Sequence, residues 1–222
     1  MPTGFPPPAR AAGPAGSINK GTIALILLSL VNCANIYPGC MGEQGSAIHY
    51  VCTHEEARIL AFQHHRFWVS NCGCREERGH CGRSRIDVCL MFRGDLQASG
   101  SGIKEIGLTE VLALFDEVSE KHLVARPFRN ETNKLITDGI CFCCDDCCEY
   151  FTNPSENKCD KGRNIEWTEM DLCNFCGDCV EACYFKARRI VDGELILDRG
   201  NCYGCALCVE ICPEKCISLM VR

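Results

Sequence analysis

The sequence lacks the short motifs that mark most nucleotide-binding and hydrolytic sites. It contains no Walker phosphate loop, no G-x-G-x-x-G after an expected strand, no H-E-x-x-H and no G-x-S-x-G. It therefore gives no evidence for a nucleotide or flavin site, or for a hydrolytic nucleophile. We expect no catalytic residues of these kinds, and an autonomous enzyme is poorly supported.

Positive charge is also scarce. The 23 lysines and arginines are outnumbered by 29 acidic residues, which gives a net charge of −6. Nucleic-acid binding would call for a basic surface, so we expect no nucleic-acid partner. A mildly acidic surface suits docking onto basic patches of other proteins instead.

The sequence has little apolar chain that could cross a membrane. Residues 1–21 are rich in proline, glycine and alanine, and they precede an apolar run at 22–31. That run is too short for a bilayer, which needs ~20 residues. It resembles the apolar part of a signal peptide, but residues 32–35 form a poor cleavage site, and a buried strand fits equally well. We expect a cytoplasmic protein; a membrane-associated or exported form through 22–31 is the alternative.

Cysteine, by contrast, is abundant at 22 of 222 residues. At about a tenth of the composition, a specialised cysteine chemistry is the default expectation. Disulfide scaffolds belong to short secreted chains, whereas grouped cysteines in reducing compartments usually bind metal or carry out redox chemistry. This chain is longer than a typical disulfide scaffold and its cysteines are tightly grouped, so metal binding is favoured.

Eight of the cysteines form two matching blocks near the C-terminus. Each block has the spacing C-x2-C-x2-C-x3-C, and the second follows the first at an offset of 29 residues. The offset also aligns Glu181 with Glu210 and Lys186 with Lys215, which indicates an internal duplication. The cysteines are Cys173, Cys176, Cys179 and Cys183 in the first block and Cys202, Cys205, Cys208 and Cys212 in the second.

This spacing suits a pair of iron–sulfur cubanes. Three cysteines on one loop can bind three irons of a cubane, while the fourth, at the start of the following helix, serves the other cluster. We therefore expect Cys212 to complete the ligands of the first loop and Cys183 those of the second. Zinc also binds C-x2-C pairs, but it explains neither the third equally spaced cysteine nor the crossed fourth.

Residues 165–222 resemble the bacterial-type ferredoxin domain with two [4Fe-4S] clusters. The resemblance rests on the eight cysteines and on Pro213 after the last of them. It implies a ferredoxin-like fold of duplicated halves and a low-potential one-electron carrier with two close cubanes. Tyr184 departs from the pattern, because proline usually follows the fourth cysteine of the first block.

The chain before this domain has the pattern of a small mixed α/β unit. A capping box of Thr53 and Glu56 predicts one helix, and apolar residues at helical spacing predict a second. Two short strands follow the second helix, an arrangement compatible with a winged helix. The fold class is therefore expected to be α+β. The expected helices are 54–66 and 109–121, and the expected strands are 48–51, 67–69, 123–128 and 134–142.

Composition divides the chain into four parts. These are a flexible lead with the apolar run at 1–45, a cysteine-rich domain at 46–151, a polar linker at 152–164 and the ferredoxin domain at 165–222.

Two further cysteine groups lie in the cysteine-rich domain. In the stretch GICFCCDDCCEYF at 139–151, Cys141, Cys144 and Cys147 repeat the C-x2-C-x2-C loop spacing. Cys143 and Cys148 are extra. Because adjacent cysteines point apart, one of each pair is expected to serve a second metal or a neighbouring group. The candidate ligands of an additional centre or centres are Cys72, Cys74, Cys81, Cys89, Cys141, Cys144, Cys147 and Cys159.

Three interpretations of these upstream cysteines stay open. They are an additional iron–sulfur centre, a structural zinc site, and free or redox-active thiols. Asp145 and Asp146 are interpreted as turn residues rather than metal ligands. Four arginines near the first group serve solubility or offset the negative charge of a thiolate-bound cluster: Arg75, Arg78, Arg83 and Arg85. The isolated cysteines are interpreted as buried small hydrophobic residues: Cys33, Cys40, Cys52 and Cys216.

Residues 48–222 also resemble a poorly characterised set of 4Fe-4S proteins from anaerobes. The matching residues are Cys72-Gly73-Cys74-Arg75, Cys81, Cys89-Leu90 and the cysteines of 141–148. The resemblance implies little about mechanism.

The favoured function is an iron–sulfur electron-transfer protein or redox subunit with redox protein partners. Its cofactors would be two [4Fe-4S] clusters and a further upstream iron–sulfur or zinc centre. The alternative is an iron–sulfur enzyme or reductase subunit that acts on a small substrate or disulfide at the upstream centre. A redox-sensing regulator on a winged helix is disfavoured by the acidic charge.

Overall fold

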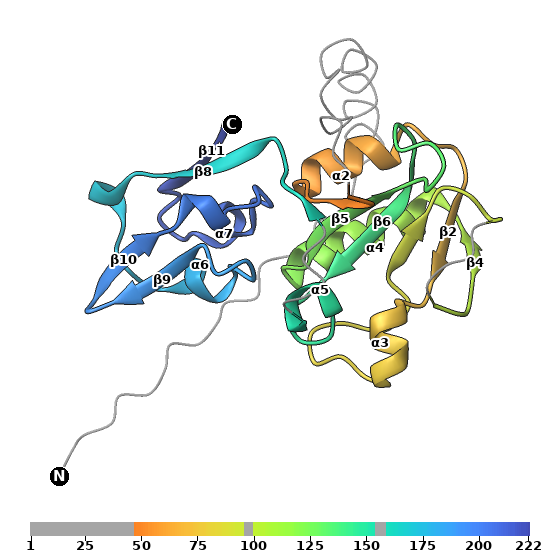
Figure 1. Cartoon of the computed structure of the whole chain (residues 1–222), viewed down its shortest axis with the longest axis horizontal. Coiled ribbons are helices and arrows are strands. Elements are labelled where there is room, and N and C mark those ends of the chain that lie inside the picture. The colour runs from red at the N-terminus through yellow and green to blue at the C-terminus, as the bar shows by residue number, and fades with distance from the viewer. Residues whose placement is uncertain (1–46, 96–99, 154–158) are drawn as a thin grey trace. The chain divides into compact units, whose positions relative to one another are not determined.

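The computed structural model describes residues 47–95, 100–153 and 159–222. The apolar run at 22–31, with Cys33 and Cys40, lies outside the described residues. The described residues all belong to one compact unit. Within it the fold is α+β, as predicted (Figure 1). Among the described residues, no helix has both the length and the apolar character needed to cross a bilayer.

A seven-stranded sheet is the frame of the upstream part. Its strands lie in the order β4-β2-β3-β6-β5-β1-β7, antiparallel except for the parallel pair β1 and β7. The strands are β1 (His49–Tyr50), β2 (Phe67–Ser70), β3 (Cys89–Met91), β4 (Lys104–Ile106), β5 (Val124–Arg129), β6 (Thr137–Cys143) and β7 (Cys159–Asp160). The helices of this part are α2 (His54–Ala61), α3 (Gly73–Arg78), α4 (Leu108–Glu120) and α5 (Glu149–Thr152).

Helices α2 and α4 form as the sequence predicts. Thr53 and Glu56 make the capping box of α2, which ends at Ala61, with Phe62 as its C-cap, rather than at the predicted residue 66. The strands that follow α4 also form, but β5 and β6 lie in the middle of the sheet between β1 and β3. They are therefore not the free wing of a winged helix, and that part of the prediction is wrong. The predicted linker at 152–164 contains β7, which joins the sheet edge through β1.

The hydrophobic core lies between these helices and one face of the sheet. Side chains alternate between the two faces of a strand, so Ile140 and Phe142 of β6 share a face. Both are buried in one cluster with residues of α2 and α4, and the Phe115 ring of α4 lies edge-on to Phe142 at 5.7 Å. Leu90 of β3, paired with Ile140, belongs to the same face.

The opposite face of the sheet carries cysteines. Cys141 and Cys143 alternate with Ile140 and Phe142 and therefore point away from the helices. Residues paired directly across strands have side chains on the same face. The strand pairings place four more residues on the face of Cys141 and Cys143. They are Arg126, which is paired with Cys141, and Cys89, His49 and Cys159 on the strands β3, β1 and β7. We call this set the cysteine face.

The C-terminal part is built from two similar halves, as the duplication predicts. Its elements are β8 (Asn164–Thr168), η2 (Met170–Leu172), α6 (Asp178–Glu181), β9 (Arg188–Val191), β10 (Glu194–Leu197), η3 (Arg199–Asn201), α7 (Leu207–Ile211) and β11 (Ile217–Val221). The starts of η2, α6 and β9 recur 29 residues later as η3, α7 and β11. Strand β8 pairs with β11 and β9 with β10, both antiparallel.

The backbone of the two halves repeats at the same offset. The left-handed conformation, which most side chains avoid, recurs at three equivalent positions of the two halves. They are Phe175, Gly177 and Lys186 in the first half and Gly204, Ala206 and Lys215 in the second. Each pair differs by 29 residues. The loops that carry the cysteines therefore share one conformation.

Candidate metal centres

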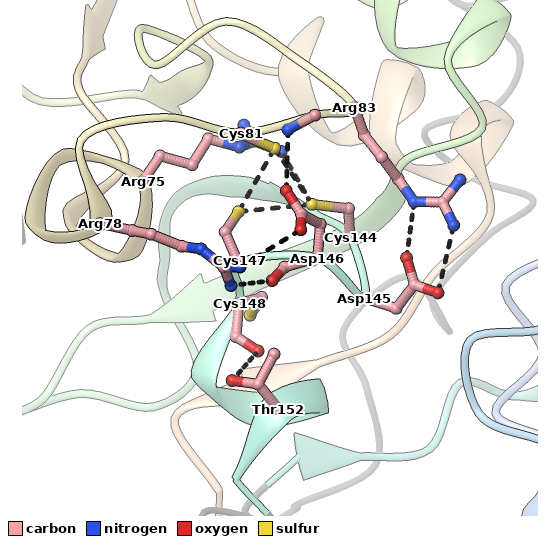
Figure 2. A network of polar contacts seen from close by, with 11 residues as sticks. Arg75, Arg78, Cys81, Arg83, Cys144, Asp145, Asp146, Cys147, Cys148 and Thr152 are labelled. Carbon is pink, nitrogen blue, oxygen red and sulfur yellow. Dashed lines mark hydrogen bonds and ion pairs between the residues drawn. The ribbon is translucent and has the colours of Figure 1, made fainter.

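The clearest metal-ligand geometry is a triangle of three thiols upstream. The Sγ atoms of Cys81 and Cys144 are 3.5 Å apart, and each lies 3.4 Å from Sγ of Cys147. Cys81 follows α3, whereas Cys144 and Cys147 belong to the turn after β6. Figure 2 shows these three sulfur atoms joined, with the sulfur of Cys148 outside the triangle. We call Cys81, Cys144 and Cys147 the thiol triangle.

The spacing of the thiol triangle suits one metal ion. Four thiolates around a tetrahedral zinc with bonds of about 2.3 Å are about 3.8 Å apart. Thiolates on a cubane are separated by several irons and so lie further apart. The three measured distances are close to the first case. The three sulfur atoms are the described ligand atoms that lie within 4.8 Å of one another here.

A buried arginine compensates charge at the triangle. The side chain of Arg75 is fully buried, and its guanidinium donates to the carbonyl oxygen of Phe142 at 3.0 Å and to Sγ of Cys144 at 3.7 Å. Burial by itself raises the pKa of Cys81, but the backbone amide of Arg83 and the neighbouring thiols outweigh it and lower that pKa. The lowered pKa favours thiolate at Cys81, whereas burial, followed by contact with the Cys144 and Cys81 thiols, raises the pKa of Cys147.

The two aspartates of the stretch hold the loop that carries Cys81. Asp146 accepts from the backbone amide of Gly82 at 2.8 Å and pairs with Arg78 at 3.6 Å. Asp145 pairs with Arg83 at 2.6 Å (Figure 2). Residues 145–147 form a turn, in agreement with the sequence prediction. Three of the arginines noted in the sequence therefore have two roles at the site. Arg75 places a buried positive charge beside the Cys144 thiol, and Arg78 and Arg83 hold the loop through their ion pairs with the aspartates.

Cys141 does not join the two cysteines with which it shares the loop spacing. It lies on the cysteine face, where its Sγ is 3.7 Å from that of Cys89 and 3.8 Å from Nε2 of His49. Contact with the Cys89 thiol, followed by burial, raises the pKa of Cys141. Burial, followed by the charge of Arg126, lowers the pKa of His49 to about 4, so that its ring is neutral and able to accept. The structure therefore separates the C-x2-C-x2-C of the sequence into two places.

The remaining upstream cysteines gather around Arg126. The thiols of Cys72 and Cys74 contact each other, and Cys148 contacts both Cys74 and Cys143. The hydrogen bond from Cys148, with the charge of Arg126, outweighs burial and lowers the pKa of Cys143 to about 6. Nearby, burial raises the pKa of Cys159 to about 11.

In the C-terminal part, the structure brings four predicted ligands around one cavity. Cys173, Cys176 and Cys179 of the first loop line it together with Cys212 of the second block. Cys216, predicted to be buried, is buried, but its Sγ lies 3.5 Å from that of Cys212 and also lines the cavity. Its equivalent in the first half is Ala187, which carries no sulfur.

The other four predicted ligands also lie close together. Cys205 and Cys208 lie within range of the charges of Cys183 and Cys202. Burial is the main cause that raises the pKa of Cys208, to about 12. Cys183 and Cys202 share a small buried cluster. In each set, therefore, three cysteines come from one block and the fourth from the other.

Sequence analysis missed two buried arginines among the cysteines. Arg126 is 5% exposed, and Arg188 is 2% exposed and donates to Sγ of Cys179 at 3.3 Å. Arg188 also bonds Thr168 at 2.7 Å and pairs with Glu166. The sequence did contain a signal for them. A charged residue at a position of a strand that faces inward is rare unless its charge is paired.

Tyr184, the departure from the ferredoxin pattern, is a packing residue. It is 4% exposed and belongs to the main hydrophobic core. The guanidinium of Arg83 lies 4.9 Å from its ring centre, and the Phe151 ring packs edge-on at 5.9 Å. An aromatic ring supplies these contacts, whereas proline would supply neither.

Comparison with known proteins gives a partial match. The chain is 33% identical over 60 residues to a subunit of the ion-translocating oxidoreductase complex of Methanosarcina acetivorans. The match covers 27% of this chain and 23% of that protein, so the chain spans less than a quarter of this relative. No family model matches the chain, and no solved structure matches it.

Proposed function

We propose that this chain is an iron–sulfur electron-transfer protein or redox subunit with two [4Fe-4S] clusters. One cluster would be bound by Cys173, Cys176, Cys179 and Cys212. The other would be bound by Cys202, Cys205, Cys208 and Cys183. A further thiolate-bound metal would sit at the thiol triangle.

The observation that carries the proposal is the crossed arrangement of the eight C-terminal cysteines. Cys212 lines the cavity of the first loop, and Cys183 lies with the cysteines of the second. A zinc site needs four ligands, which one cysteine block could supply alone. Zinc binding therefore does not explain why the fourth cysteine of each set comes from the other half. Two neighbouring cubanes do require it.

The surroundings of the cysteines fit clusters that carry negative charge. Arg188 donates to Cys179 and also lies within the field of Cys208, which belongs to the other set. Its positive charge, offset in part by the buried Glu166 with which it pairs, lies beside both sets and favours the reduced, more negative state of the clusters. Clusters tuned in this way are suited to accept single electrons and pass them on.

The partners supported best are redox proteins. The partial match is to a protein named as an oxidoreductase complex subunit, which supports a role within a chain of electron carriers. The net charge of −6 suits docking onto basic partner surfaces. We propose no nucleic-acid partner, because a basic surface is lacking.

Electron uptake tests the proposed function. We expect the anaerobically purified full-length protein to take up about two electrons per chain, one for each cubane. The titration would be followed by the loss of visible absorption on stepwise addition of dithionite. A one-electron acceptor protein should then recover the absorption. A chain that takes up no electrons while holding its metal would contradict the proposal.

A further inference from the structure

Two thiols on neighbouring strands lie side by side on the cysteine face, away from the thiol triangle. We propose that Cys89 and Cys141 are a dithiol–disulfide couple, which exchanges two electrons with a disulfide compound. This two-electron activity goes beyond the single-electron role proposed above and does not depend on the metals of either part of the chain. We call Cys89 and Cys141 the cross-strand pair.

The sheet places the two sulfur atoms within reach of a covalent bond. Strands β3 and β6 are antiparallel with Leu90 opposite Ile140, and this register puts Cys89 opposite Cys141. Residues directly opposite each other in such a pair have Cα atoms about 4.5–5.5 Å apart, and disulfides join Cα atoms about 4.4–6.8 Å apart. The two Sγ atoms are 3.7 Å apart. A disulfide can therefore form here with little movement of the strands.

The surroundings of the cross-strand pair favour a disulfide over a metal ion. The thiol triangle is the one place among the described residues where three possible ligand atoms lie within 4.8 Å of one another. Nε2 of His49 lies 3.8 Å from Sγ of Cys141, but His49 and the two thiols do not form a second such set within the described ranges. Two thiols without a third ligand at this spacing do not enclose an ion.

His49 is placed to take the proton of Cys141. Burial, followed by the charge of Arg126, lowers the pKa of His49 to about 4, so its ring is neutral and Nε2 can accept the thiol proton. Cys141 and His49 are half-buried, whereas Cys89 is buried. A disulfide compound therefore meets the cross-strand pair at Cys141, the sulfur that has the proton acceptor beside it.

The exchange balances in atoms, electrons and protons. The Cys141 sulfur attacks one sulfur of the disulfide compound, and the first small thiol leaves with the proton that His49 took up. The Cys89 sulfur then attacks that of Cys141, and the second small thiol leaves with the proton of Cys89. The bond of the disulfide compound breaks and the bond between Cys89 and Cys141 forms. The cross-strand pair loses two electrons to the compound, and a dithiol reductant reverses the reaction.

Disulfide mapping of the wild-type protein tests the proposal. The full-length protein would be equilibrated anaerobically in mixtures of glutathione and glutathione disulfide, from the reduced and the oxidised side, then quenched with acid and alkylated. Trypsin releases Cys89 as the single cysteine of residues 86–93, and Cys141 within residues 135–158. We expect these peptides to be linked through Cys141, in a ratio of linked to unlinked that follows glutathione disulfide over the square of glutathione.

Three results of this mapping would overturn the proposal. The first is complete alkylation of Cys89 and Cys141 at every mixture. The second is linkage of Cys89 to another cysteine of residues 135–158. The third is protection of both cysteines from alkylation without any linkage, which is the behaviour of metal ligands.

Urea unfolding of matched variants separates a bond in the folded sheet from a chance linkage. The bond would join residues 52 apart in the sequence, and closing such a loop stabilises a folded protein. Wild type and Cys52→Ser, which removes another buried thiol, should unfold at higher urea when oxidised than when reduced. Cys141→Ser and Cys89→Ser should each unfold at the same urea concentration in both states. An equal rise in all four proteins, or no rise in wild type, would overturn the proposal.

Discussion

Replacing Cys183 by alanine is expected to remove the cluster bound by the second cysteine loop and leave that of the first. The expected loss is about four irons, because a cubane that lacks one of its four thiolates is exposed to solvent and loses iron. The reason lies in the crossed arrangement, which puts Cys183 with Cys202, Cys205 and Cys208. Cys183→Ala with Cys202→Ala should therefore lose no more iron than Cys183→Ala alone.

The equivalent change in the other half should behave differently. Cys216 lies 3.5 Å from Cys212, whereas its counterpart beside Cys183 is Ala187. We expect Cys216 to replace the missing ligand in Cys212→Ala, so that this variant keeps more iron than Cys183→Ala. Cys212→Ala with Cys216→Ala should then lose about four irons. The measurement is iron and labile sulfide per chain.

Uncrossed pairing predicts the opposite pattern. In that case Cys183→Ala with Cys173→Ala would remove one cluster, and Cys183→Ala with Cys202→Ala would remove both. Either result would contradict the assignment of the fourth ligands.

Replacing Arg75 by methionine is expected to give the largest loss of stability in the upstream part. Arg75 is fully buried, and its guanidinium donates to Phe142 and Cys144. Methionine keeps the bulk but leaves a buried carbonyl without its donor and the thiolates without their cation. Removing one partner of a buried charge pair costs about 3–5 kcal/mol. Anaerobic urea unfolding followed by circular dichroism would measure the change.

Two control variants sharpen this prediction. Arg85→Met removes an arginine that is 42% exposed at its side chain and pairs with Asp87 and Glu117, so it should cost under about 1 kcal/mol. Arg75→Lys keeps the charge without the planar fork and should fall between the two. Equal losses for Arg75→Met and Arg85→Met would show that the thiols near Arg75 are uncharged in the folded protein.

The local parts of the fold could be predicted from sequence because their signals are local. The capping box at Thr53 fixes the start of α2, and the offset of 29 residues recurs in the backbone of both C-terminal halves. The alternation of side chains along β6 also predicts the cysteine face. Ile140 and Phe142 lie on the core side of the strand, so Cys141 and Cys143 lie on the other side. The sheet order could not be predicted, because pairing between strands far apart in sequence depends on tertiary packing.

The upstream site was predicted only in part for the same reason. Spacing along the chain grouped Cys141 with Cys144 and Cys147, but Cys141 is still within β6, whereas the other two lie in the turn beyond it. Side-chain direction, set by the strand, therefore outweighs spacing. Cys81, rather than Cys141, lies beside Cys144 and Cys147. The loop of Cys81 is held by the hydrogen bond from Gly82 to Asp146, a contact between residues 64 apart in the sequence that no local pattern reveals. The buried arginines were missed because their cysteine partners, 9 to 22 residues away in the sequence, lie on other segments that only the folded chain brings beside them.

Metal and sulfide analysis of anaerobically purified protein, joined to low-temperature EPR after reduction, tests the central claim most directly. Two cubanes held by crossed ligands predict at least about eight irons and eight labile sulfides per chain, with a spectrum of two magnetically interacting clusters. Zinc or iron beyond the cubane content would then report the metal proposed at the thiol triangle. Fewer than about eight sulfides, with zinc in place of iron, would contradict the account, because a mononuclear ion carries no labile sulfide.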